Sequence, residues 1–131
     1  MTNIVPLILI VDDEPIMRLL VRETLASHPL LSFLEAEDGE QALELVSATL
    51  PDLILLDVML PKLDGIAVCK IIKNDPNMKP IYIALVTALD TPEYFIYGVS
   101  AGADDYLTKP FEEADLWQVV TRALHNDPSL Q

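Results

Sequence analysis

Short apolar runs alternate along the chain with stretches in which apolar residues recur every three or four positions. A run of roughly four to eight apolar residues between polar ones is typical of a buried strand. Five such runs lie at residues 7–11, 31–37, 52–57, 81–87 and 105–108. Elsewhere the spacing i, i+3, i+4, i+7 predicts helices. The clearest stripes are Ala42, Leu45, Val46 and Thr49; Val68, Ile71 and Ile72; and Leu116, Val119, Val120 and Ala123.

Five strands that alternate with five helices predict an α/β fold, in which helices cover both faces of a five-stranded parallel sheet. The first, third and fourth runs are uniformly apolar, so we expect them inside the sheet. The second run contains Glu35 and Glu37 and the fifth is short, which places both at the edges. With right-handed crossovers, this predicts the doubly wound, flavodoxin-like strand order 2-1-3-4-5.

The segment TPEYFIYGVSAGA (91–103) predicts a helix of unusual composition. Thr91 is a candidate N-cap, Pro92 suits the first helical turn, and the acid Glu93 suits the positive end of the helix dipole. The segment is apolar on most sides, and such a helix is usually covered. Either part of it meets a partner or a second copy of the chain, or it presents an ordinary core face.

Composition restricts the class of protein. The 131 residues suit a single domain over 1–131, with a core from about residue 6 to about residue 125. A net charge of −13, with only eight scattered Lys and Arg, argues against nucleic-acid binding. The single cysteine, Cys69, excludes an internal disulfide and suits a reducing cytoplasm. No apolar stretch approaches the roughly 20 residues of a membrane helix, and no signal peptide is evident, so we expect a cytoplasmic protein without a membrane partner.

Polar side chains follow the predicted strands where their carboxyl ends meet. Asp12 and Asp13 follow the first strand and Asp57 ends the third, at the switch point where such sheets bind ligands. Thr87 ends the fourth strand and Lys109 follows the fifth. Three carboxylates and one ammonium sum to −2, which one divalent cation neutralises, and hard oxygen ligands suit Mg²⁺. Zinc is not expected, because the histidines and Cys69 lack the spacing of zinc ligands.

The motifs LILIVDDEP, AEDGEQAL, PDLILLDVMLPKLDG, IALVTA and SAGADDYLTKPF stand in this order along the chain. With them the sequence resembles the receiver domain of two-component response regulators, which has a CheY-like fold, over nearly its whole length. The resemblance implies that Asp57 accepts a phosphoryl group from a phosphohistidine. It also implies that Asp12, Asp13, Asp57 and the backbone carbonyl of Met59 hold Mg²⁺, for which Mn²⁺ could substitute.

The resemblance assigns further roles at the same edge of the sheet. Lys109 would pair with Asp57 before transfer and with a phosphoryl oxygen afterwards, and the bond before Pro110 would be cis. Thr87 and Ala88 would bind the phosphoryl group. Tyr106 would turn inward as a switch residue, unless it is an ordinary aromatic of an edge strand.

Some positions depart from the family pattern. Met59 and Leu89 are apolar at positions that influence hydrolysis of the aspartyl phosphate in the family, so we expect slow self-dephosphorylation. Val119 stands where one subfamily of transcription factors has a basic residue used for dimer pairing. This departure weakens an analogy to the dimers of that subfamily.

The sequence therefore predicts a signalling domain rather than an enzyme with an external product. Its partners would be a sensor histidine kinase or a histidine phosphotransferase, and an output domain, another protein or a second copy bound through residues 91–103. A phosphatase or phosphotransferase with an aspartyl nucleophile would usually have an acid at Met59 and a cap domain. A flavin-binding module would not place the acidic DDEP after its first strand, and no Walker loop is present. A phosphate-independent pseudo-receiver scaffold is a further alternative.

Overall fold

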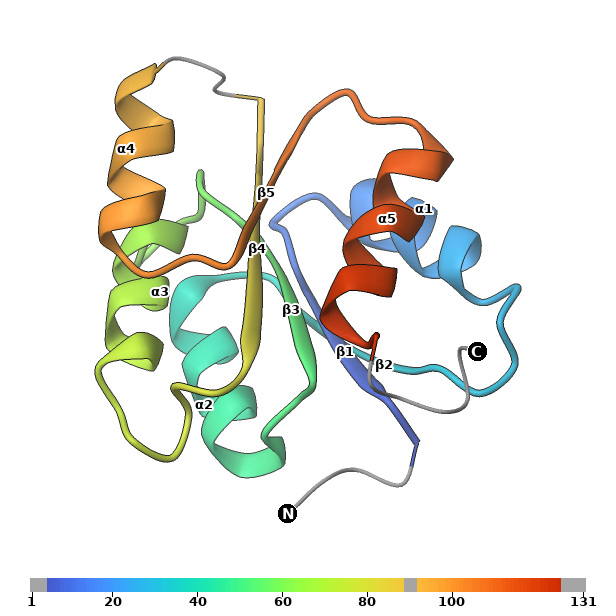
Figure 1. Ribbon diagram of the computed structural model, residues 1–131, viewed down its shortest axis with the longest axis horizontal. Helices are drawn as coiled ribbons and strands as arrows, with labels where there is room; N and C mark the ends of the chain where they lie inside the picture. The colour runs from blue at the N-terminus through green and yellow to red at the C-terminus, as the bar shows by residue number, and fades with distance from the viewer. Residues whose placement is uncertain (1–4, 89–91, 126–131) are drawn as a thin grey trace.

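The protein forms a five-stranded parallel sheet in the order β2-β1-β3-β4-β5, with helices on both faces (Figure 1). This computed structural model describes residues 5–88 and 92–125. The strands are β1 (Leu7–Val11), β2 (Ser32–Ala36), β3 (Leu53–Asp57), β4 (Tyr82–Thr87) and β5 (Asp105–Thr108). The helices are α1 (Pro15–Leu25), α2 (Gly39–Thr49), α3 (Gly65–Lys73), α4 (Pro92–Ser100) and α5 (Glu113–Ala123). The predicted fold class and strand order are confirmed, with β2 and β5 at the edges.

Alternate residues of each inner strand point to opposite faces of the sheet, so two separate cores form. Ile8 and Ile10 of β1 pack with α1 and α5, whereas Leu9 and Val11 pack with α2 and α3. Figure 1 shows the same division, with α1 and α5 on one side of the sheet and α2, α3 and α4 on the other. The uniformly apolar strands β1, β3 and β4 are therefore buried on both faces, as predicted.

Three predicted strands are one residue too long at their starts, and the second is also one residue too long at its end. Leu31 donates its N–H to the carbonyl of His28, within a turn before β2. The side chain of Asp52 accepts a hydrogen bond from the N–H of Leu7, at 2.8 Å, and so caps β1 instead of extending β3. Polar and turn hydrogen bonds therefore set these boundaries, and hydrophobicity alone does not locate them.

The helix starts follow local hydrogen bonding. The side chains of Asp38 and Asp64 accept N–H groups of Gln41 and Ala67, at 2.8 and 2.9 Å, and so cap α2 and α3. Helix α4 begins at Pro92 as predicted, whereas the predicted cap Thr91 lies outside the described residues. The periodic stripes of α2 and α5 face the sheet.

One position in the predicted stripe of α3 is wrong. Val68 and Ile72 are fully buried, but Ile71 is exposed. Val68 and Ile72 lie about one turn apart and share a face, whereas Ile71 projects roughly 100° away from Ile72 around the helix. None of the helices in the described part of the chain is long and apolar enough to cross a membrane.

Candidate functional site

The predicted cluster of carboxylates forms where β1 and β3 end. Val11 of β1 pairs with Leu56 of β3, so the next residues, Asp12 and Asp57, lie side by side. Both are buried, and Asp13 is exposed beside them. One carboxylate oxygen from each of the three residues lies within 4.8 Å of the others. Three hard oxygen donors at this spacing, without a histidine or cysteine among them, fit a divalent cation such as Mg²⁺.

Lys109 supplies a positive charge to the cluster from the far edge of the sheet. Its Nζ lies 2.8 Å from Oδ2 of Asp12 and 3.1 Å from Oδ2 of Asp57. The N–H of Lys109 also donates to the carbonyl of Thr87, at 2.7 Å, which fixes the segment after β5 against β4. The Lys109–Pro110 peptide bond is cis, as expected. The pairing with Asp57 was predicted, but the shorter contact with Asp12 was not.

The surroundings shift the protonation equilibria of this group. Burial raises the pKa of the Asp57 carboxyl above its ordinary value, and the negative charge of Asp12 raises it further against the opposing attraction of Lys109. Burial alone would lower the pKa of Lys109, but its hydrogen bond with Asp12 and the charge of Asp57 outweigh burial and raise it. Lys109 is therefore held as a cation beside carboxylates that repel one another.

The backbone after β3 closes tightly around Asp57. The N–H of Met59 donates to Oδ1 of Asp57 at 3.1 Å, and the N–H of Gly65 donates to the carbonyl of Val58 at 2.9 Å. A Cβ atom on Gly65 would overlap the carbonyl oxygen of Asp57. The absence of a side chain at Gly65 therefore allows α3 to start against the strand that carries Asp57. Sequence reasoning missed this role, although the LDG tripeptide marks the helix start.

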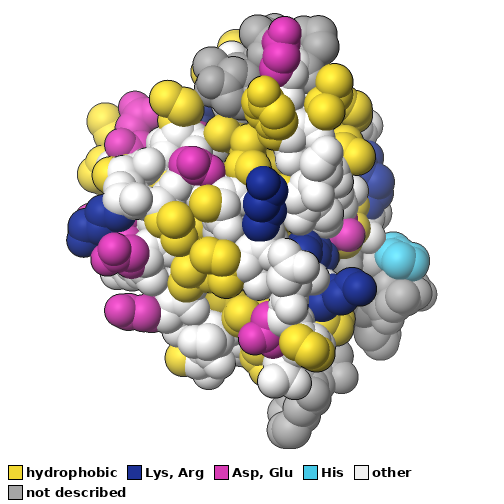
Figure 2. Space-filling view, turned by 90° about the vertical axis from the view of Figure 1, so that its left-hand side faces the viewer, with side chains coloured by type: hydrophobic (Ala, Val, Ile, Leu, Met, Phe, Trp, Pro, Cys, Tyr) yellow, Lys and Arg dark blue, Asp and Glu magenta, His cyan; other side chains and the backbone are white. Residues whose placement is uncertain are grey.

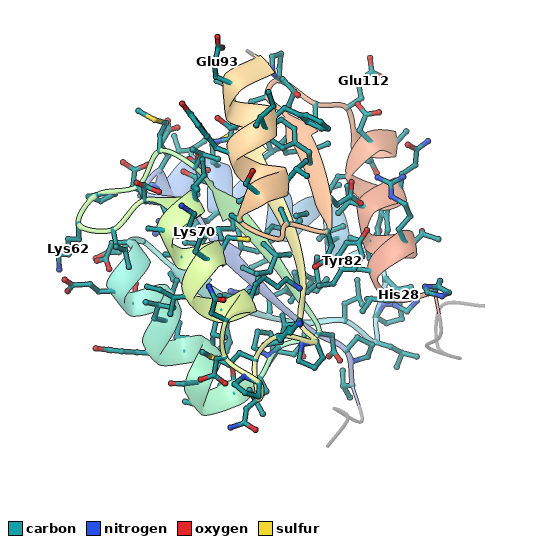
Figure 3. The ribbon with its side chains drawn as sticks, turned by 60° about the vertical axis from the view of Figure 1, so that its left-hand side comes forward. His28, Lys62, Lys70, Tyr82, Glu93 and Glu112 are labelled. Atoms are coloured by element: carbon teal, nitrogen blue, oxygen red, sulfur yellow. The ribbon has the colours of Figure 1, made fainter. Side chains whose placement is uncertain are left out.

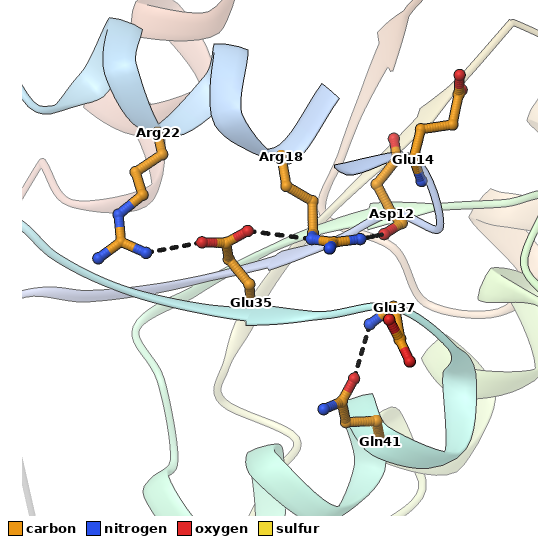
Figure 4. A network of polar contacts seen from close by, with 7 residues as sticks. All are labelled: Asp12, Glu14, Arg18, Arg22, Glu35, Glu37 and Gln41. Carbon is orange, nitrogen blue, oxygen red and sulfur yellow. Dashed lines mark hydrogen bonds and ion pairs between the residues drawn. The ribbon is translucent and has the colours of Figure 1, made fainter. Parts of the chain in front are cut away.

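A second cation, which sequence reasoning also missed, holds the backbone of Asp12 (Figure 4). Nη1 of Arg18, on α1, donates to the carbonyl oxygen of Asp12 at 2.6 Å, and Nε donates to Oε1 of Glu35 at 3.0 Å. Arg22, one turn later, contacts the other oxygen of Glu35 at 2.7 Å. The hydrogen bond from Arg22 lowers the pKa of Glu35, with a further contribution from Arg18 against the effect of burial. Glu35 was noted only as a mark of an edge strand, but it orients the arginine that binds the turn after β1.

The remaining predicted site residues lie along β4 and β5. Thr87 is fully buried at the end of β4, and Ala88 is exposed after it. Tyr106 of β5 is half-buried, with its ring 5.7 Å from that of Phe95 in an edge-to-face arrangement. An added Cβ on Gly98 of α4 would meet Leu85 and come within 3.8 Å of the Tyr106 ring. Tyr106 thus packs beneath α4, and Leu89 lies outside the described residues.

Two groups of apolar side chains are exposed near this edge. Met59, beside Asp57, is 61% exposed. On α4, four large apolar side chains are each more than half exposed, and Figure 2 shows yellow side chains over this helix. They are Phe95, Ile96, Tyr97 and Val99. The alternative of an ordinary core face for this helix is therefore wrong for these four residues. Val119, in contrast, is buried on the face of α5 that packs against the sheet.

Comparisons with known proteins agree with this geometry. The family model described as the response regulator receiver domain matches residues 8–121. The response regulator PleD of Caulobacter vibrioides is 44% identical over 111 residues, which are 84% of this chain and 24% of PleD. The alkaline phosphatase synthesis transcriptional regulatory protein PhoP of Bacillus subtilis is 44% identical over 109 residues, 83% of this chain and 44% of PhoP. The chain thus spans less than half the length of these relatives.

A solved structure shares the fold over almost the whole chain. It is a putative response regulator from Chloroflexus aurantiacus, with a TM-score of 0.86 and 35% sequence identity. The superposition covers 92% of this chain and 98% of that one.

Proposed function

The chain belongs to the family of response regulator receiver domains, and on this premise we propose that it accepts a phosphoryl group on Asp57 from a phosphohistidine of a partner protein. An oxygen of the Asp57 carboxylate attacks phosphorus, the P–N bond to the imidazole breaks, and the imidazole nitrogen keeps that electron pair. The product on this chain is an acyl phosphate. The observation that carries the proposal is the position of the buried Asp57 in a cluster with Asp12, Asp13 and Lys109.

The proposed cofactor is Mg²⁺, held by Asp12, Asp13, Asp57 and the backbone carbonyl of Met59, with Mn²⁺ as a possible substitute. When bound, the ion neutralises the excess negative charge of the cluster and of the incoming phosphoryl group. The chain's own residues orient the reacting atoms. The N–H of Met59 and the ammonium of Lys109 each hold one oxygen of Asp57, which leaves its carboxylate fixed in one orientation.

We further propose that the new phosphoryl group changes the hydrogen bonding at the edge of the sheet. Lys109 then contacts a phosphoryl oxygen, while the hydroxyl of Thr87 and the backbone at Ala88 bind the others. Thr87 lies opposite Thr108 in the β4–β5 pairing, so a shift at Thr87 reaches the strand that carries Tyr106. Tyr106 and α4 then repack between two arrangements, which is the output of the domain.

Partners follow from this role. The donor is a sensor histidine kinase or a histidine phosphotransferase, and the setting is the cytoplasm. The chain accepts and slowly loses its own phosphoryl group and forms no external product, so it is not an enzyme in the usual sense.

The exposed side chains of α4 meet an output domain, another protein or a second copy. Sedimentation with and without beryllofluoride tests the last case, and a monomer in both conditions would exclude it.

The decisive experiment measures the intact mass of the protein after incubation with acetyl phosphate and Mg²⁺. Addition of one phosphoryl group is expected, and it should disappear in Asp57→Asn and in the presence of a chelator. If no mass is gained by folded protein, beryllofluoride binding separates two explanations. A site that binds the mimic accepts phosphate only from its cognate phosphohistidine, whereas a site that does not bind it belongs to a phosphate-independent scaffold.

A further inference from the structure

A groove runs between α3 and α4, away from the edge that carries Asp57. It consists of two adjoining hollows, with volumes of about 400 Å³ and about 500 Å³. Lys70 and Ser100 line both hollows, so the two adjoin at these residues. The groove begins at Met59, beside the phosphoacceptor, and ends at Lys79, beyond the last turn of α3.

The end of the groove near Met59 is mainly apolar. Met59, Ile66, Ala67 and Tyr97 line it together with one acid, Asp64. The side chains of Met59 and Tyr97 are more than half exposed. Exposed apolar side chains on both walls of a hollow offer area that a partner would remove from water. The first half of the groove therefore favours one or two apolar side chains.

The other end of the groove is basic, in a chain with a net charge of −13. Lys70, Lys73 and Lys79 line it, three of the eight basic residues of the chain. Lys73 is already engaged, since its Nζ contacts Asp104 at 2.7 Å and the carbonyls of Lys79 and Ile81 at 2.9 and 2.6 Å. Within residues 5–88 and 92–125, no ion pair reaches Lys70 or Lys79, and both are exposed.

Stabilisation of the C-terminal end of α3 explains the positions of only two of these three lysines. Lys70 and Lys73 lie in the last turn of α3, where cations favour the helix dipole. Lys79 lies after the helix, yet it lines the same hollow as Lys70. Figure 3 shows Lys70 on α3, and Figure 2 shows dark blue side chains beside yellow ones in the middle of this face. The acids that line the two hollows are already engaged, since Asp104 pairs with Lys73 and Asp64 accepts the N–H of Ala67. Lys70 and Lys79 thus lie next to an apolar hollow with no ion pair among the described residues.

We propose that the groove between α3 and α4 binds a segment of a partner protein in which apolar side chains are followed by acidic ones. The apolar residues occupy the end near Met59 and Tyr97, and the acids contact Lys70 and Lys79. Charge complementarity favours an acidic segment over a second copy of this chain, because two copies at −13 repel one another. The proposal does not depend on phosphoryl transfer, so each stands or falls separately.

A fluorescein-labelled peptide of two leucines followed by four glutamates is a suitable probe, and its binding is followed by anisotropy. Saturable binding is expected, weakened about tenfold or more in the variant Lys70→Glu/Lys79→Glu. Lys62→Glu is the matched control, because Lys62 is exposed and faces Asp38 and Glu40 instead of the groove. Binding should also weaken as salt shortens the Debye length from about 10 Å at 0.1 M to about 3 Å at 1 M.

The apolar half is tested on α4. Tyr97→Ala should weaken binding severalfold, whereas Ile96→Ala should not, since Ile96 is as exposed as Tyr97 but lines neither hollow. All these positions are on the surface, and circular dichroism verifies that each variant folds. The proposal is overturned if the probe does not bind saturably to the unmodified protein. It is also overturned if Lys62→Glu or Ile96→Ala weakens binding as much as its groove counterpart does.

Discussion

The ammonium of Lys109 lies 2.8 Å from Oδ2 of Asp12, closer than the 3.1 Å that separates it from Oδ2 of Asp57. The lysine follows the edge strand β5, and Asp12 follows β1, three strands away in the sheet. One side chain thus crosses the carboxyl ends of β4 and β3 and reaches both buried acids. It stabilises the cluster before any cation or phosphoryl group is bound.

Replacement of Lys109 by Met should destabilise the metal-free protein, because two buried carboxylates lose their cation. We expect a loss of about 1–3 kcal/mol in the free energy of unfolding, below the 3–5 kcal/mol of a fully buried pair. Added Mg²⁺ should restore part of it. Urea unfolding with a chelator and with Mg²⁺ measures both effects. Lys62→Met is the control, since Lys62 is 58% exposed and 3.6 Å from its acid, and an equal loss there would contradict the prediction.

Replacement of Asp13 by Asn should have the opposite effect on the metal-free protein. The exposed Asp13 adds repulsion to Asp12 and Asp57 without contacting Lys109 in the described structure. Its removal should raise the stability by about 1 kcal/mol, or the melting temperature by about 3 °C. The further increase on addition of Mg²⁺ should shrink, because one of the proposed ligands is lost. Thermal melts with and without Mg²⁺ test this, and a lower melting temperature in chelator would disprove it.

Arg18 and Arg22 form a matched pair for testing the turn after β1. Both contact Glu35, but only Arg18 also donates to the backbone of Asp12, and its side chain is 14% exposed against 46% for Arg22. Arg18→Ala should therefore weaken Mg²⁺ binding about tenfold, as loss of a group that orients metal ligands commonly does. Arg22→Ala should change it little. Calorimetric titration with Mg²⁺ gives both affinities, and equal effects would mean that charge, rather than orientation, matters.

Met59→Asn should quicken the loss of the phosphoryl group severalfold. Met59 is exposed beside Asp57, and its thioether is only a weak hydrogen-bond acceptor, whereas an amide in its place both donates to and accepts from water. The decay of the intact-mass signal after removal of the phosphodonor measures the rate. Ile71→Asn, an equivalent change at an exposed position of α3, should leave the decay unchanged. An unaltered decay in Met59→Asn would refute slow hydrolysis through this residue.

The phenol of Tyr82 should lose its proton at a higher pH than an ordinary tyrosine does. Burial, with a hydrogen bond to Asp105 at 2.9 Å, raises the pKa of Tyr82 to about 12. The folded state holds this proton more tightly than the unfolded chain, in which the pKa is about 10. The resulting stability is complete below about pH 10 and is lost between about pH 10 and 12. Phenolate absorbance after a rapid pH jump tests this.

Two variants assign that titration. Tyr82→Phe should remove the component that titrates near pH 12. Asp105→Asn should move it toward pH 10, because the charge and the hydrogen bond of Asp105 both raise the pKa of Tyr82. A Tyr82 component already at pH 10 in the unmodified protein would contradict the prediction.

Sequence pattern was sufficient for the strand order and the acid cluster, for a physical reason. Strands buried on both faces must be apolar throughout, and the residues that end them must lie at one edge of the sheet. The positions of Asp12, Asp57 and Lys109 follow from these two constraints.

The missed features depend on how segments approach one another in space. Arg18 contacts both the carbonyl of Asp12 and Glu35, seventeen positions after it, because β1 and β2 lie side by side in the sheet. Gly65 matters because α3 starts against the carbonyl of Asp57. Neither contact leaves a periodic signal in the sequence. The start of β3 was misplaced because the Asp52 side chain bonds to β1.

The exposed apolar side chains of α4 should make self-association of this chain depend on ionic strength. Copies with a net charge of −13 repel one another in dilute buffer, which keeps the exposed side chains of Phe95, Ile96, Tyr97 and Val99 apart. Salt screens the repulsion but leaves the hydrophobic attraction intact. The same protein should therefore remain dispersed at low salt and self-associate in concentrated sulfate.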